Sequence, residues 1–93
     1  MNPDYRIGVI GTGNMGSAII TGIIKGIHPA LIKAYDTDAD KLKSIADETG
    51  IKISDSIEEL IIDTDILIIS VKPDVTLKVA EKLKNYHGII LSV

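Results

Sequence analysis

The residues with the clearest chemical potential form a glycine-rich segment near the start of the chain. Gly11-Thr12-Gly13-Asn14-Met15-Gly16 matches the pattern G-x-G-x-x-G and directly follows the hydrophobic run 7–10. Between a strand and a helix, Gly11 permits a tight turn, Gly13 lets a pyrophosphate approach the backbone, and Gly16 lets the helix pack closely. Backbone N–H groups at the start of the helix then face the phosphates. The segment predicts a dinucleotide site at Gly11, Thr12, Gly13, Asn14 and Met15; a structural turn without a ligand is the alternative.

A carboxylate at the end of the predicted second strand belongs to the same hypothesis. Asp36 follows the run 31–35, about 25 residues after Gly11, near the spacing of the acid that accepts hydrogen bonds from the adenosine ribose. Its charge would oppose a 2′-phosphate, and Lys41 and Lys43 are the nearby cations in the sequence. The site, which includes Thr37, therefore favours NADH within the class of NAD(P)H cofactors. A loop or helix-capping aspartate is the alternative.

A third group lies at the end of the predicted fourth strand and comprises Ser70, Val71, Lys72 and Pro73. In a doubly wound sheet, strands 1 and 4 are neighbours at the topological switch point, where the ligand crevice lies. Pro73 would fix the backbone as it leaves the strand, and Lys72 would place a cation beside the nicotinamide half of the cofactor. A solvated lysine before a helix is an equally good interpretation.

Alternating strand and helix patterns position these residues. Short β-branched runs cover 7–10, 31–35, 51–53, 66–71 and 89–93, and segments of helical spacing lie between them. The helices are expected to stop near Gly26, Gly50 and Gly88, and to begin with Ser56 in a capping box and with Asp74 as an N-cap. The order β-α-β-α-β-α-β-α-β predicts a single α/β domain over residues 1–93, with a doubly wound parallel sheet of strand order 3-2-1-4-5.

Two features indicate a missing partner surface. The chain stops inside its fifth strand, and Ile20 and Ile24 add apolar surface beside the main stripe of the first helix. A second domain or another chain would cover them; an ordinary edge strand and a well-packed helix are the alternative. Met15 is expected to be a packing residue that lines the crevice.

Composition excludes several function classes. The 93 residues carry a net charge of −3, three tyrosines as the only aromatics, two histidines and no cysteine. These counts argue against disulfides, thiolate catalysis, cysteine-ligated zinc and nucleic-acid binding. With no long apolar run and no signal-peptide profile, we expect a cytoplasmic protein without a membrane partner or metal site. No residue is chosen as catalytic.

Taken together, Gly-Asn-Met-Gly at 13–16, Val71-Lys72-Pro73 and Ile90-Leu91-Ser92-Val93 resemble the N-terminal Rossmann-like domain of pyrroline-5-carboxylate reductase. The resemblance covers roughly the first third of that enzyme. It implies reduction of 1-pyrroline-5-carboxylate to L-proline, the last step of proline biosynthesis, with NAD(P)H as hydride donor. It also implies that residues 11–15 hold the pyrophosphate, that residues 70–73 line the nicotinamide side, and that a C-terminal helical domain for substrate and homo-oligomer contacts is absent from this chain.

Departures from the family pattern keep other interpretations open. Asp36 stands where members that prefer NADPH often carry small polar residues, and a common asparagine after strand 3 has no clear equivalent at Ser56 or Ile57. β-Hydroxyacid dehydrogenases and the deazaflavin (F420)-dependent NADP reductases have a similar glycine loop, although Lys72-Pro73 argues against both. A non-catalytic dinucleotide-binding module is a further alternative, and we expect the 93-residue chain alone to be inactive.

Overall fold

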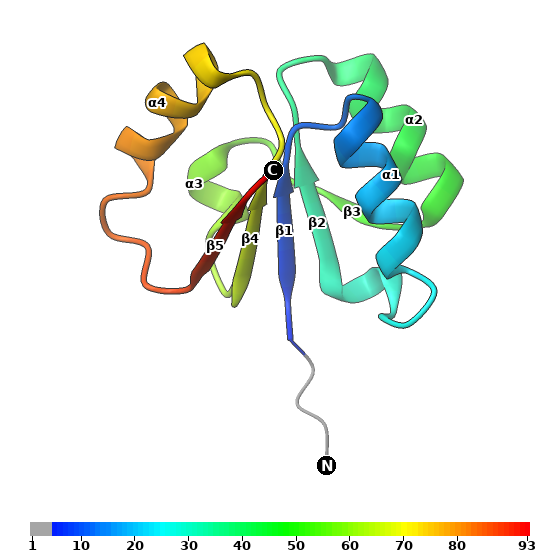
Figure 1. Cartoon of the computed structure of the whole chain (residues 1–93). Coiled ribbons are helices and arrows are strands. Elements are labelled where there is room, and N and C mark those ends of the chain that lie inside the picture. Colours follow the sequence, from blue (N-terminus) through cyan, green and yellow to red (C-terminus); the bar gives the residue numbers. More distant parts are fainter. Residues whose placement is uncertain (1–4) are drawn as a thin grey trace.

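The computed structural model describes residues 5–93 (Figure 1). None of the helices in this range is long and apolar enough to cross a membrane. Five strands alternate with four α-helices, and a short 3-10 helix, η1, precedes the second strand. The strands are β1 (Ile7–Ile10), β2 (Ile32–Tyr35), β3 (Lys52–Ile53), β4 (Ile66–Ile69) and β5 (Ile89–Ser92); the helices are α1 (Asn14–Ile23), η1 (Pro29–Leu31), α2 (Ala39–Thr49), α3 (Ile57–Leu60) and α4 (Pro73–Lys82).

The strands form one parallel sheet in the order β3-β2-β1-β4-β5. Its central strand is β1, which pairs with β2 on one side and with β4 on the other along its whole length. Both the strand order and the doubly wound α/β class predicted from the sequence are therefore confirmed. This order places the ends of β1, β2 and β4 side by side.

The helices cover both faces of the sheet, with α1 and α2 on one side and α3 and α4 on the other (Figure 1). Alternate residues of β4 point to opposite faces: Ile68 packs in the cluster under α1 and α2, whereas Leu67 and Ile69 pack under α3 and α4. Each such burial contributes about 1.5–3 kcal/mol relative to an exposed side chain. Burial on both faces is the physical reason why β4 lacks polar alternation.

Helix α1 differs from the sequence expectation at its end and along its faces. It ends at Ile23, three residues before the expected stop at Gly26. Ile20 has no exposed surface, and Ile24 packs against the core between α1 and the sheet. The prediction that these two side chains form an unpartnered surface is wrong, because the folded domain itself covers them. Met15 is 60% exposed, so its expected packing role is also wrong.

Helix α4 begins earlier than predicted. Lys72, not Asp74, is the N-cap residue, and Pro73 is the first helical residue. Proline is favourable at this position, because its fixed φ suits a helix and its missing N–H would have had no intrahelical partner. The strand before it also ends early, at Ile69.

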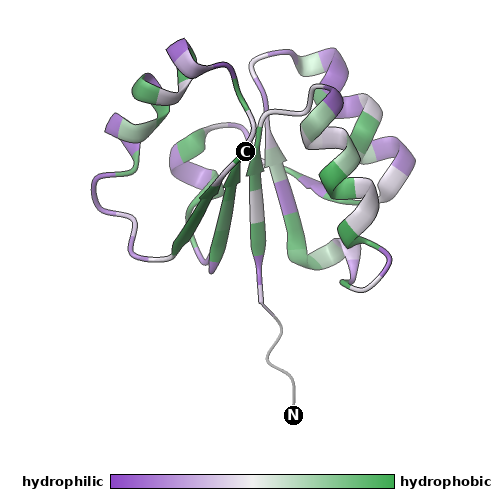
Figure 2. Cartoon of the chain, in the orientation of Figure 1, coloured by the Kyte–Doolittle hydropathy of each residue, from purple (hydrophilic) through white to green (hydrophobic). Residues whose placement is uncertain are grey.

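The edge strand β5 carries the unpartnered apolar surface that the sequence indicated. Ile89, Ile90 and Leu91 are 60%, 44% and 50% exposed, and the strand is coloured as hydrophobic along its length in Figure 2. Exposed edge strands usually carry charges or prolines that discourage pairing with another chain. β5 has neither.

The C-cap of α2 gives a prediction about stability. Gly50 ends the helix in the left-handed conformation, with φ of 81°, so Gly50→Ala should lower the free energy of unfolding by about 1 kcal/mol. Gly22 is the matched control: it is exposed within α1, and an added Cβ would meet nothing within 4 Å. Gly22→Ala should raise the free energy of unfolding by about 0.5–1 kcal/mol. Urea denaturation measures both changes in the free energy of unfolding. Two changes of the same sign would contradict the prediction.

Candidate functional site

Two of the three glycines in the motif are required by the protein's own backbone. Gly11 has φ of 101°, and a Cβ there would overlap the carbonyl oxygen of Ser70. A Cβ at Gly16 would overlap the carbonyl oxygen of Gly11. The first glycine therefore allows the turn between β1 and α1 to pass close to the end of β4, and the third allows α1 to fold back onto that turn.

Gly13 differs, because a Cβ at this position would meet nothing within 4 Å. The space beside it is open, and Gly13 caps α1 without a side-chain hydrogen bond. In contrast, the side chains of Asp38 and Ser56 cap α2 and α3. Since the first N–H groups of a helix have no intrahelical acceptor, the positive end of α1 is free to receive an anion.

The carboxylate of Asp36 links β2 to the glycine turn. Its Oδ2 accepts hydrogen bonds from the backbone N–H of Thr12 at 2.7 Å and from Thr12 Oγ1 at 2.8 Å. Its Oδ1 accepts one from the N–H of Asp38 at 2.9 Å. The structure thus brings two predicted site residues, Thr12 and Asp36, into direct contact, which the sequence did not indicate.

These contacts lower the pKa of Asp36. Burial is the largest single influence and raises the pKa, but the hydrogen bonds from Asp38 and Thr12, aided by the charge of Lys41, outweigh it. The pKa of the carboxyl therefore lies below its usual value, and Asp36 is ionised at neutral pH.

A cavity of about 310 Å³ opens at the carboxyl ends of β1 and β2, between α3 and α4. Four predicted site residues line it: Gly11, Asp36, Thr37 and Val71. Its apolar wall comes from side chains that the sequence analysis did not place in the site, namely Ile57, Val75 and Val79. An apolar wall opposite a carboxylate suits a flat ring attached to a sugar.

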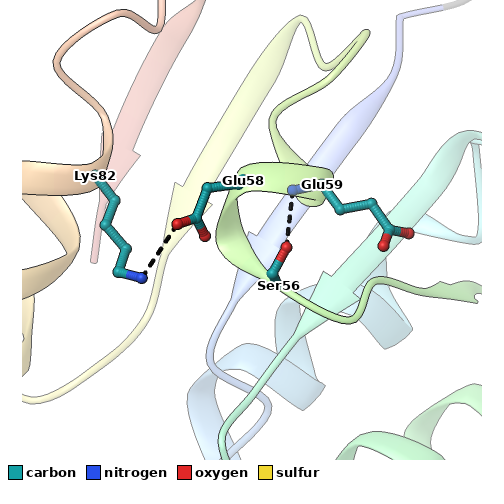
Figure 3. Close-up of polar contacts among 4 residues, drawn as sticks. All are labelled: Ser56, Glu58, Glu59 and Lys82. Atoms are coloured by element: carbon teal, nitrogen blue, oxygen red, sulfur yellow. Dashed lines mark hydrogen bonds and ion pairs between the residues drawn. The ribbon is translucent and has the colours of Figure 1, made fainter.

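Charged side chains from α3 and α4 also line this cavity. Lys78 and Lys82 extend from α4, and Lys82 Nζ lies 3.3 Å from Glu58 Oε2 of α3 (Figure 3). The pKa of Glu58 is lowered, first by a hydrogen bond from its own backbone N–H and then by Lys82. Lys78 and Lys82 therefore add cations to the cavity that Asp36 lines, beyond Lys41 and Lys43, which are local in the sequence. Helix α4 comes some 40 residues after Asp36 in the chain. No local sequence pattern therefore indicates that its lysines line the same cavity as Asp36.

The short helix α3 carries the predicted N-terminal cap. Ser56 Oγ accepts a hydrogen bond from the N–H of Glu59 at 3.1 Å, while the carboxylates of Glu58 and Glu59 point apart (Figure 3). The cap fixes the start of α3, and with it the positions of Ser56 and Ile57 in the cavity wall. The sequence analysis assigned no ligand contact to either residue.

The remaining predicted residues surround the turn on its other sides. Thr12, Gly13 and Asn14 line a second, more open groove between α1 and α2. Ser70 lies against Gly11 and Gly16, whereas Lys72 and Pro73 are exposed at the start of α4. The end of β4 thus contacts the glycine turn through Ser70 and Val71, and Lys72 stands farther out.

The lowered pKa of Asp36 gives a pH-dependent contribution to stability. In the unfolded chain the carboxyl titrates near 3.8, and in the folded chain below that value. Its stabilising contribution is therefore complete above the unfolded pKa and is lost as pH falls through the folded pKa. In urea unfolding from pH 7 to pH 3, the stability difference between wild type and Asp36→Asn should shrink at the acid end. A difference that stays constant would contradict the assignment.

A protein-family model described as "NADP oxidoreductase coenzyme F420-dependent" matches residues 6–93. The chain belongs to this family. The family model alone does not test the expectation that Lys72-Pro73 argues against an F420-dependent NADP reductase. Because the match consists of the sheet, its helices and the glycine turn, membership identifies the type of domain and leaves the substrate open.

The chain is also similar to pyrroline-5-carboxylate reductases. That of Aquifex aeolicus is 35% identical over 88 residues, which are 95% of this chain and 33% of that protein. The solved structure of the Coxiella burnetii enzyme superposes with a TM-score of 0.87 at 28% identity, over 98% of this chain and 36% of that one. The Plasmodium falciparum enzyme, solved with NADP bound, gives a TM-score of 0.81 at 28% identity, over 97% of this chain and 33% of that one.

These comparisons confirm the Rossmann-like fold and the resemblance to pyrroline-5-carboxylate reductase. The chain spans about a third of the length of the curated relatives that it matches. The similarity therefore concerns one domain of proteins that are about three times longer.

Proposed function

We propose that this chain is the NAD(P)-binding domain of an oxidoreductase that reduces 1-pyrroline-5-carboxylate to L-proline. The observation that carries the proposal is the open space beside Gly13, near the end of the central strand and at the start of α1, where no side chain accepts a capping hydrogen bond. Similarity to pyrroline-5-carboxylate reductases across almost the whole chain supports the choice of substrate.

The arrangement suggests how a dinucleotide would lie. The adenosine half occupies the cavity beside Asp36 and Thr37, with its ring against the apolar wall. The diphosphate meets the N–H groups of Asn14 and Met15 at the start of α1. The nicotinamide half extends along residues 70–73, where Val71 borders the adenosine cavity and Lys72 stands at the exposed side.

The contribution of this domain to the reaction is to position the cofactor. A bound NAD(P)H would supply the hydride that reduces the carbon of the C=N bond, with a proton for the ring nitrogen coming from outside this domain. Residues 11–15 and Asp36 hold the dinucleotide so that its reactive carbon faces the substrate. We assign no acid–base role to any side chain of this domain.

We further propose that substrate and oligomer contacts come from a helical domain outside these 93 residues. The apolar surface of Ile89, Ile90 and Leu91 supports a covering partner on β5. We propose the cytoplasm as the location, with a small-molecule substrate and no nucleic-acid or membrane partner.

Calorimetric titration of the chain tests the binding half of the proposal. NADH and ADP-ribose should bind with similar affinities, in the micromolar range or weaker, because both carry the adenosine and the diphosphate. Nicotinamide mononucleotide should bind much more weakly, since it lacks the adenosine and one phosphate. Comparable affinities for NADH and nicotinamide mononucleotide would contradict a site built on the glycine turn.

An assay of the whole gene product for cofactor-dependent interconversion of proline and its cyclic imine tests the catalytic half. We expect turnover by the whole product and none by the 93-residue chain. Dinucleotide binding without turnover by the whole product would favour the non-catalytic module instead.

Cofactor preference depends on opposing charges in one cavity. Asp36 disfavours a 2′-phosphate, which is the basis for proposing NADH, whereas Lys78 and Lys82 on the facing helix attract it. Asp36→Ser should raise the affinity for NADPH relative to NADH by about tenfold, because removing a unit charge near the phosphate is worth about 1–2 kcal/mol. Lys78→Ala should move the same ratio in the opposite direction. An unchanged ratio in fluorescence titrations of Asp36→Ser would remove Asp36 from the site.

A further inference from the structure

Thr12 is a buried polar residue within the glycine turn, with only 3% of its surface exposed. Its N–H and its hydroxyl both donate to the same oxygen of Asp36, and its carbonyl oxygen accepts from Ser17 Oγ at 2.8 Å. Three of its polar groups are thus committed to the protein. Hydrogen bonds to an ionised carboxylate are among the stronger ones, so these contacts fix the conformation of the turn.

The contact ties the turn to the neighbouring strand. Asp36 directly follows β2, and the N–H of Gly11 donates to the carbonyl oxygen of Tyr35 at 2.9 Å. The end of β2 therefore holds both Gly11 and Thr12, the two residues that lead into the open position at Gly13. The N–H groups that would face a diphosphate start one residue after Gly13, at Asn14.

The hydrogen bonds leave Asp36 little capacity for a ligand. A carboxylate offers about four acceptor positions, two on each oxygen. Thr12 takes both positions on Oδ2, and the N–H of Asp38 takes one on Oδ1. One position on Oδ1 remains, whereas a ribose would present two adjacent hydroxyl donors.

We propose, on the basis of the dinucleotide-binding function proposed above, that Thr12 and Asp36 form a positioning pair that holds the glycine turn for a diphosphate, and that Asp36 consequently binds only one ribose hydroxyl. Thr12 is a positioning residue, since it acts on the ligand through the turn. Asp36 has two roles: its Oδ2 holds Thr12, and its Oδ1 has the acceptor position that remains for a ribose hydroxyl.

Calorimetry on the wild-type chain tests how many ribose hydroxyls Asp36 binds. The three probes are ADP, 2′-deoxy-ADP and 3′-deoxy-ADP. One deoxy analogue should bind about tenfold more weakly than ADP, because a hydrogen bond to a charged acceptor is lost. The other should bind within about twofold of ADP. Equal losses for both analogues would overturn the single-hydroxyl assignment.

The positioning role is tested with Thr12→Val, which removes the hydroxyl and keeps the N–H and the side-chain shape. The readout is the ratio of ADP to AMP affinity, in which adenosine contacts cancel and contacts of the second phosphate remain. We expect the ratio to fall about fivefold to tenfold and to be restored in Thr12→Ser. Thr49→Val is the matched control, because its hydroxyl donates to the carbonyl oxygen of Ile45 at the far end of α2; its ratio should not change.

The outcomes separate this pair from the function on which it rests. If ADP binds and the ratio is the same in wild type and Thr12→Val, the positioning role is overturned while dinucleotide binding stands. If ADP does not bind to the wild-type chain, both are overturned. Should Thr12→Val fail to fold, the deoxy analogues still decide the role of Asp36, because they need no variant.

Discussion

Replacing Gly13 by valine is expected to abolish NADH binding and leave the fold intact. A Cβ at Gly13 meets no protein atom within 4 Å, so we expect the free protein to accommodate the larger side chain. That same space is where the diphosphate would approach the N–H groups of Asn14 and Met15. Because several hydrogen bonds to phosphate would be lost together, each worth about 1.5–3 kcal/mol, the affinity should fall by at least about 100-fold.

Calorimetry with NADH and a thermal unfolding curve give the two measurements for Gly13→Val. The midpoint of unfolding should fall by no more than about 4–8 °C, since the cost is limited to a less favourable N-cap residue, about 1 kcal/mol. Gly22→Val serves as a control, because Gly22 is equally open but lies at the other end of α1. Retained affinity in Gly13→Val would show that the diphosphate does not pass this residue.

The glycine turn shows how much of the site could be predicted from sequence. The roles of Gly11, Gly13 and Gly16 depend on the presence or absence of a Cβ next to backbone atoms, and a strand followed by a helix determines that geometry. The uninterrupted apolar run in β4 likewise predicted a strand covered on both faces. The alternation of strands and helices predicted the strand order. Patterns that are local in the chain were sufficient for these features.

The other half of the cavity could not be predicted in this way. Glu58 and Lys82 belong to two helices, α3 and α4, whose side chains line the same cavity as Asp36 only in the folded chain. The contact between Thr12 and Asp36 has the same origin, because it requires β1 and β2 to be in register. Ile20 shows the opposite error. Its position beside the main helical stripe indicated exposure, but it packs into the core cluster between the sheet, α1 and α2 and has no exposed surface.

Replacing Gly11 by alanine is expected to destabilise the whole domain. Its φ of 101° is unfavourable for alanine, at about 1–2 kcal/mol. The added Cβ would also overlap the carbonyl oxygen of Ser70 and approach Val71, and relief requires β1 and β4 to separate at their ends. Overpacking of this kind adds about 1–3 kcal/mol. The free energy of unfolding should therefore fall by about 2–5 kcal/mol.

The matched control for Gly11→Ala lies two residues away in the same turn. Gly13 has φ of −69° and open space around it, so Gly13→Ala should cost no more than about 1 kcal/mol. At about 4–8 °C for each kcal/mol in a domain of this size, thermal unfolding should separate the two alanine variants by at least about 5 °C. Similar midpoints would mean that the turn can move away from Ser70 at little cost. The close contact between β4 and the turn would then not be what shapes the site, and Gly11 would be needed for the ligand alone.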